Sequence, residues 1–141
     1  MGKILPDGFA MPAIEPLNEP FFTSGRLMLQ VCKQCDTVQH PPEDICRSCQ
    51  AMELGWCEAA GTGEVYSFTV AQYAIHPDLA DRIPYAAAIV QLDDHPHVRI
   101  TGNILNIPPD KVEIGLPVRV VFEDTTNADG RKLKLPQWEA V

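Results

Sequence analysis

Hydrophobic and polar residues alternate in five short runs along the second half of the chain, the pattern of half-buried β-strands. These runs are rich in β-branched and aromatic residues, which favour strands. They cover Glu64–Val70, Tyr85–Leu92, His97–Leu105, Pro117–Phe122 and Lys132–Trp138. Because side chains alternate between faces at a period of two, we expect an inward-facing set in the third and fourth runs. That set is Val98, Ile100, Gly102 and Ile104, followed by Val118, Val120 and Phe122.

The segments between the runs indicate how the strands connect. Asp93–Pro96 has the composition of a turn, and Pro108–Gly115 has room for one helical turn. Tyr73–Pro84 is a longer loop that contains His76. Five short strands with a small helical element between the third and fourth is the order of an OB-fold barrel. An SH3-like barrel or a small sandwich also fits this pattern.

The first twenty-five residues have a different character. Prolines disfavour regular structure there, which predicts an extended arm; they stand at positions 6, 12, 16 and 20. A short helix is predicted over residues 18–25, with Asn18 as its cap and Gly25 as its stop. Phe21 and Phe22 form an apolar pair on this helix. They either fix the helix to its own domain or contact a partner protein.

Between these regions, four of the five cysteines form two tight pairs, Cys32–Cys35 and Cys46–Cys49. Two such CxxC turns can place four sulfur atoms around one tetrahedral zinc ion. A redox CxxC motif would begin a helix after a strand, and neither pair has a helix-like sequence behind it. Because four thiolates complete the coordination sphere, we expect one structural zinc per chain.

The residues around the cysteine pairs refine this prediction. Leu27–Val31 is predicted to be the strand leading into the first pair, and Pro41–Asp44 the loop of a hairpin between the pairs. The residue after a CxxC turn often has a left-handed backbone conformation; here it is Asp36 and Gln50 rather than glycine. His40 is expected to be a bystander, and Cys57 a packing residue.

Charge narrows the classes of function. The formal net charge is −8, which opposes binding to a phosphate backbone. The sequence contains no apolar run long enough for a signal peptide or a membrane span, and its odd number of cysteines argues against a disulfide framework. We therefore expect a cytoplasmic protein that has no membrane segment.

These motifs together resemble the DUF35 family. The resemblance rests on the C-x2-C-x10-C-x2-C ribbon after a short aromatic helix, on the G-x-G-x-V-Y-S-x-T segment from Gly61, and on Ile83-Pro84-Tyr85-Ala86. Ile114–Val118 and the closing Leu135–Trp138 also match, so the likeness spans roughly residues 18–138. It implies a mainly β protein in which a short helix and a rubredoxin-like zinc ribbon precede a five-stranded OB-fold. The corresponding expected units are residues 1–25 (arm and helix), 26–58 (ribbon) and 59–141 (barrel).

The resemblance also implies a function: a non-catalytic accessory subunit of a thiolase-superfamily enzyme, such as a thiolase, an acyl-CoA synthase or an aldolase. The OB-fold would contact acyl-CoA or complete the CoA site of the partner. Candidate contacts to CoA are Arg131, Lys132, Lys134, Trp138 and His76. From the residues alone, a solvated strand edge that blocks aggregation is the preferred explanation of the three basic residues, and closing the barrel is the default role of Trp138.

Two other functions remain open at this stage. The first is binding of single-stranded nucleic acid, a common use of OB-folds and zinc ribbons, although Tyr85 is the only aromatic residue between positions 85 and 105. The second is a purely structural scaffold for the partner enzyme. Independent catalysis is not expected, because a turn explains the cluster of acidic residues and histidines at positions 93–97.

Overall fold

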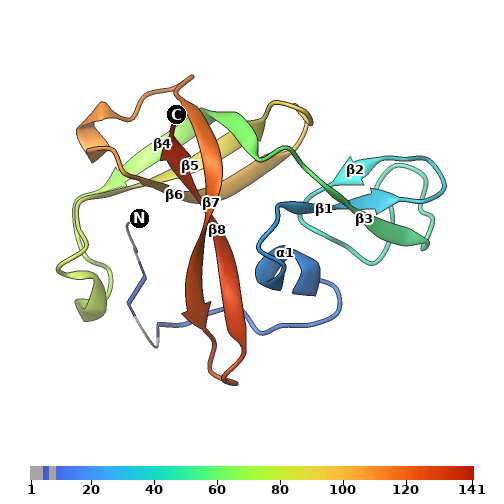
Figure 1. The fold of residues 1–141 in the computed structure, drawn as a ribbon, viewed down its shortest axis with the longest axis horizontal. Helices are drawn as coiled ribbons and strands as arrows, with labels where there is room; N and C mark the ends of the chain where they lie inside the picture. Colours follow the sequence, from blue (N-terminus) through green and yellow to red (C-terminus); the bar gives the residue numbers. More distant parts are fainter. Residues whose placement is uncertain (1–4, 7–8) are drawn as a thin grey trace.

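A computed structural model describes residues 5–6 and 9–141. Two lobes lie side by side in Figure 1: a three-stranded ribbon and a closed barrel, with the short helix α1 between the ribbon and the long β7–β8 hairpin. The prediction of a mainly β protein with one short helix is confirmed. Among the described residues, no helix is long and apolar enough to cross a bilayer.

Helix α1 spans Glu19–Thr23, close to the predicted position. Pro20 lies in its first turn, and Gly25 follows it with a φ of 71°, which suits a residue without a side chain. The predicted cap is wrong in one respect: the side chain of Asn18 makes no capping hydrogen bond. Its amide instead bonds to the arm, accepting from the backbone N–H of Glu15 and donating to the carbonyl of Ala13.

The ribbon is a sheet of three antiparallel strands in the order β2-β1-β3. They are β1 (Met28–Cys32), β2 (Val38–Gln39) and β3 (Leu54–Glu58). The predicted hairpin around Pro41–Asp44 is wrong, because β2 turns back onto β1 across the first CxxC turn and the chain from His40 to Cys46 has no strand. Sequence reasoning also missed β3, whose residues show only partial burial.

The second lobe is a closed five-stranded barrel in the order β4-β5-β6-β8-β7. Its strands are β4 (Thr62–Ala71), β5 (Tyr85–Leu92), β6 (Arg99–Leu105), β7 (Pro117–Thr126) and β8 (Lys132–Ala140). Only β6 and β8 pair in parallel. Two 3-10 turns, η1 (Pro77–Leu79) and η2 (Pro109–Lys111), lie in the β4–β5 and β6–β7 connections. This is the predicted OB-fold.

The inward-facing positions follow the predicted alternation in β6 but not throughout β7. Val98, Ile100 and Ile104 are buried, and Gly102 faces the indole ring of Trp138. In β7, Val118 is buried, whereas Val120 and Phe122 are only half-buried. Beyond them the buried side chains belong to Glu123, Thr125 and Asn127. The second half of β7 therefore buries polar side chains, which contact other segments of the chain.

A single apolar core joins the two lobes. Phe21 of α1 and Leu27 and Leu29 of the ribbon belong to the same buried cluster as the barrel interior. Polar contacts reinforce this junction: Asp94 accepts a hydrogen bond from the backbone N–H of Ala60, and His97 Nε2 lies 2.9 Å from the carbonyl oxygen of Val38. The acidic and histidine side chains of the β5–β6 turn thus connect barrel and ribbon.

Candidate metal centre and ligand surfaces

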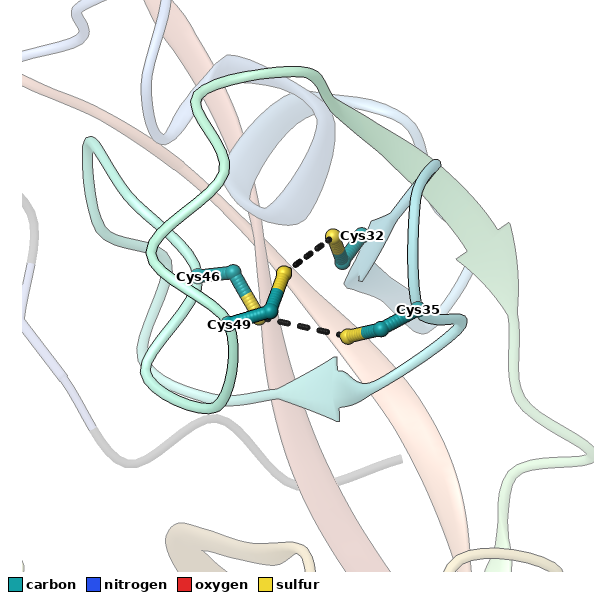
Figure 2. Close-up of side chains that lie close together, drawn as sticks. All are labelled: Cys32, Cys35, Cys46 and Cys49. Carbon is teal, nitrogen blue, oxygen red and sulfur yellow. Dashed lines mark hydrogen bonds between the residues drawn. The ribbon is translucent and has the colours of Figure 1, made fainter.

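The four paired cysteines converge at one end of the ribbon (Figure 2). Their sulfur atoms all lie within 4.8 Å of one another. Cys32 Sγ is 3.7 Å from Cys49 Sγ, and Cys35 Sγ is 3.6 Å from Cys46 Sγ. The edge of a zinc tetrahedron with Zn–S bonds of about 2.3 Å is ~3.8 Å long. The distances therefore fit a zinc ion bound by four cysteines.

The two CxxC turns repeat one hydrogen-bonding pattern. The carbonyl of the first cysteine accepts from the residue after the second: Asp36 N–H donates to Cys32 and Gln50 N–H to Cys46, both over 2.9 Å. Backbone N–H groups inside the turns approach the sulfur atoms of Cys32 and Cys46 at 3.4 Å. Asp36 and Gln50 have φ values of 61° and 63°, so the expected left-handed positions are occupied without glycine.

Electrostatics favours a bound cation at this centre. The backbone N–H of Cys49 is the main cause that lowers the pKa of Cys46 to about 6, and the hydroxyl of Thr37 lowers the pKa of Cys35. The N–H of Ala51 also acts to lower the pKa of Cys49, but burial and the neighbouring thiols raise it to about 12. Four sulfurs this close cannot all become thiolates without a counter-charge. A zinc ion held by these four cysteines would supply that charge and would couple metal binding to folding.

A buried pair of glutamines supports the second turn, and sequence reasoning missed it. Gln30 and Gln39 face each other across β1 and β2, and Gln39 Nε2 donates to Gln30 Oε1 over 2.7 Å. Gln39 also donates to the carbonyl of Ile45 and accepts from the N–H of Arg47, next to Cys46. Gln30 bonds both backbone groups of Glu43. Hydrogen bonds from these two side-chain amides, rather than a hairpin, thus position the loop before the second cysteine pair.

His40 lies in this loop, away from the sulfur cluster. Its ring packs on Phe21, with the ring centroids 4.8 Å apart. Burial, assisted by the charge of Arg47, lowers the pKa of His40 to about 4. The imidazole is therefore neutral at pH 7, and it contributes to the junction between α1 and the ribbon.

The basic residues proposed for CoA lie on the β7–β8 hairpin and are largely engaged. Arg131 forms a 2.6 Å ion pair with Glu19 of α1, and Lys134 forms a 2.7 Å pair with Asp124 on the opposite strand. Lys132 is exposed. A hollow of about 480 Å³ adjoins Lys132 and Lys134 and is also lined by Thr23, Asp124, Thr125, Thr126 and Leu133. CoA contact by these residues stays a prediction.

The other two CoA candidates lie elsewhere. Trp138 has no exposed surface, and its side chain fills the barrel behind Gly102. This position matches the barrel-closing role, and within the described part of the chain its Nε1 has no hydrogen-bond partner. His76 caps η1, and its ring contacts Phe9 of the arm. The five candidates are therefore not gathered at one site.

The phenylalanine pair of α1 is divided between two environments. Phe21 is buried in the core that joins helix, ribbon and barrel, whereas Phe22 is half-buried beside it, with ring centroids 5.0 Å apart. A hollow of about 320 Å³ between α1 and the barrel is lined by both rings and by His40. Phe21 fixes the helix to the chain; contact of either ring with a partner remains a prediction.

A cysteine-rich ribbon joined to an OB-fold defines a class of protein, and two family profiles match this chain accordingly. Residues 23–54 match the family described as "ChsH2, rubredoxin-like zinc ribbon domain", and residues 56–123 match "ChsH2, C-terminal OB-fold domain". The chain belongs to the DUF35 family.

Named relatives agree with this assignment. A solved chain titled "Ltp2-ChsH2(DUF35) aldolase" has a TM-score of 0.75 and 38% identity, covering 92% of this chain and 98% of that one. A DUF35 domain-containing scaffold protein of Methanocaldococcus jannaschii is 37% identical over 92 residues, 64% of this chain and 63% of that protein. A probable enoyl-CoA hydratase alpha subunit of Thermomonospora curvata is 42% identical over 110 residues. The match covers 76% of this chain but only 33% of that relative.

Proposed function

We propose that this chain is a non-catalytic accessory subunit of a thiolase-superfamily enzyme that processes acyl-CoA. One structural zinc per chain would hold the ribbon, and the OB-fold would contact the partner and its CoA substrate. The observation that carries the proposal is the likeness to the ChsH2 chain of an aldolase, which extends over 98% of that chain. The hydratase and scaffold names of the curated relatives support the same role.

The outer face of the barrel supports contact with a protein. Strands β4–β6 form a shallow hollow of about 260 Å³ lined by small or apolar side chains: Ser67, Phe68, Thr69, Ala87, Ala88, Ile89 and Thr101. This side of an OB-fold is its usual ligand face. A lining without charges suits packing against a protein surface better than binding a nucleic acid backbone.

We place the complex in the cytoplasm, where cysteines remain reduced.

The partnership is tested by isolating a tagged form of the chain from its native source and identifying the enzyme that co-purifies. The partner is then produced with and without the chain. We expect acyl-CoA turnover or solubility of the partner to be lost without the chain and restored when it is added. A partner that is fully soluble and active alone would contradict the proposal.

Titration calorimetry with CoA separates the CoA-contacting role from a purely structural scaffold. We expect heat of binding that weakens in Lys132→Ala and is unchanged in Lys111→Ala, an exposed lysine on η2. If CoA gives no heat with the isolated chain or with the complex, the scaffold role alone would stand.

A further inference from the structure

An extended segment of the chain lies between two loops of the barrel. Residues 9–17, which precede α1, form no helix or strand. Figure 1 shows this arm running from beside the β4–β5 loop, which carries η1, to the β7–β8 hairpin, which it crosses before α1. In an OB-fold these are the loops after the first and fourth strands, and such loops flank the ligand site. The arm therefore occupies a position where OB-folds bind other molecules.

The β4–β5 loop holds the arm through an aromatic contact. The ring of Phe9 meets the ring of His76 edge to face, with centroids 5.5 Å apart and planes at 87°. Such pairs are favourable beyond the area that they bury. The imidazole is oriented from the other side, because its Nδ1 accepts a hydrogen bond from the backbone N–H of Asp78. His76 is thus a fixed surface for an aromatic side chain.

The β7–β8 tip holds the arm through one amide. Asn127 Oδ1 accepts from the backbone N–H groups of Asp129 and Arg131, which shapes the tip. Its Nδ2 donates to the carbonyl of Pro12 over 3.3 Å. The Arg131–Glu19 ion pair fixes the same tip to α1. The oxygen of Asn127 therefore builds the loop, and its nitrogen binds the arm.

A buried carboxylate gives a third contact. The backbone N–H of Leu5 donates to Glu123 Oε2 over 3.1 Å, and Gln137 Nε2 donates to Glu123 Oε1. The prolines at positions 6, 12 and 16 have no backbone N–H group. The arm therefore has fewer hydrogen-bond donors to satisfy and can remain extended without pairing with a strand. The three contacts come from three different parts of the barrel.

We infer that the space between the β4–β5 loop and the β7–β8 tip is a binding groove for an extended, proline-containing peptide that carries an aromatic side chain. In the free protein the arm of the chain occupies this groove. The groove selects an aromatic side chain for His76 and, further along, a backbone carbonyl for Asn127 Nδ2. A partner segment with this chemistry binds after the arm leaves. A hollow of about 260 Å³ beside Ile14 leaves room for a larger side chain than isoleucine.

The inference is tested on the full-length chain with a fluorescent peptide that has the sequence of residues 5–17. Phe9→Ala weakens the attached arm and leaves the groove intact, so we expect the peptide to bind this variant more tightly than the wild type. An attached competitor acts at an effective concentration of about 1 mM, so the difference should reach about tenfold for a peptide Kd near 0.1 mM. Binding should be lost in the double variant Phe9→Ala/Asn127→Asp and with a peptide that has Ala in place of Phe9. The inference would be overturned if the peptide bound neither Phe9→Ala nor the wild type. It would also be overturned if the peptide bound Phe9→Ala and the double variant equally well.

Amide hydrogen exchange gives a second readout that does not depend on the peptide. Asn127→Asp keeps the oxygen that shapes the tip and removes the donor to Pro12. We expect faster exchange at Phe9 and its neighbours in the arm, while the amides of Asp129 and Arg131 stay protected. Unchanged exchange in the arm would contradict the groove, and lost protection at the tip would contradict the separate roles of the two amide atoms.

Discussion

The ribbon and the barrel are stabilised by different kinds of interaction. Within residues 26–58, the only buried aliphatic side chains are Leu27 and Leu29, and both pack into the core shared with the barrel. Sulfur atoms and glutamine amides hold the rest of the ribbon. The barrel instead buries an alternating set of apolar side chains on five strands that close on themselves. Polar bonds and a cluster of four metal-binding cysteines specify the first lobe, and apolar packing specifies the second.

This difference has a consequence for how each lobe fails. A small metal-dependent segment unfolds when a single ligand is removed, because it has no apolar core large enough to keep it folded without the metal. A packed core loses stability in proportion to the volume and strain that a substitution creates.

Cys32→Ser should have the largest effect. Loss of one of four ligands should abolish stoichiometric zinc and remove metal-linked folding energy on the order of 10 kcal/mol. Hydrogen exchange should show the ribbon open while the amides of β4–β6 remain protected. Cys57→Ser is the matched control, because Cys57 lies outside the sulfur cluster. Full zinc content in Cys32→Ser would show that the ligand assignment is wrong, and loss of protection in the barrel would show that the lobes do not fail separately.

Gln39→Ala should come next. It removes the bonds to Gln30, Ile45 and Arg47 and leaves partly buried backbone groups without these partners, at a cost of about 2–3 kcal/mol. Zinc affinity should fall with stability, because the loop before Cys46 loses its support. Denaturant unfolding and a zinc competition assay measure the two effects. Gln34→Ala, in the exposed first CxxC turn, is the control. A loss of stability without any change in zinc affinity would separate the glutamines from the metal centre.

Gly102→Ala tests the barrel alone. A Cβ atom there would lie 2.8 Å from Cδ1 of Trp138, so the indole or β6 must shift, at a cost of about 1–3 kcal/mol. Zinc content should not change. Thr101→Ala, at the exposed neighbouring position, should cost less. Thermal unfolding with metal analysis makes the comparison, and reduced zinc in Gly102→Ala would mean that strain in the barrel reaches the ribbon.

His40 should have the smallest effect, which appears as a pH dependence of the free energy of unfolding. Its pKa is lowered from 6.5 to about 4, so between these values the unfolded chain takes up a proton that the folded chain does not. Stability should therefore be fully present above pH 6.5, fall as the pH decreases toward 4, and level off below it. The full shift corresponds to about 3 kcal/mol, which partial exposure of the ring reduces to about 1–2 kcal/mol.

His40→Asn is the comparison that isolates this contribution. Unfolding at pH 7 and at pH 4.5, with zinc content checked at both values, separates the histidine from protonation of the cysteines. A pH dependence that is identical in wild type and variant would remove the histidine from the explanation.

Local patterns in the sequence predicted most of the fold. The spacing of the cysteines gave both turns, including the left-handed residues Asp36 and Gln50, because turn geometry depends on neighbouring residues. Alternation gave all five barrel strands, with β7 and β8 extending past their predicted ends at Phe122 and Trp138. The extension of β7 was missed because its buried side chains, Glu123 and Thr125, are polar and look exposed in a pattern of hydrophobicity.

What the sequence did not predict depends on contacts between distant segments. Glu123 is buried where Leu5, 118 residues earlier, and Gln137 on the neighbouring strand supply hydrogen-bond donors. Gln30 and Gln39 are buried because they satisfy each other and the loop between the cysteine pairs. A single chain read in order gives no signal for such pairs; a glutamine opposite a glutamine in neighbouring short strands is the nearest indication. The same reason separates the CoA candidates: Arg131, Lys132 and Lys134 lie on the exposed part of the β7–β8 hairpin, whereas Trp138 is inside the barrel and His76 caps η1.

Closure of the barrel also determines where another chain can add a strand. Every barrel strand has a neighbour on both sides over part of its length, but β7 beyond Val120 and β8 before Trp138 pair only with each other, so the β7–β8 hairpin has two unpaired outer edges. In the ribbon, β2 is two residues long, whereas β3 is an outer strand of five residues. Self-association by strand addition at high concentration would therefore use Leu54–Glu58 or an outer edge of the β7–β8 hairpin, and charged residues placed at these edges would help to keep stored samples monomeric.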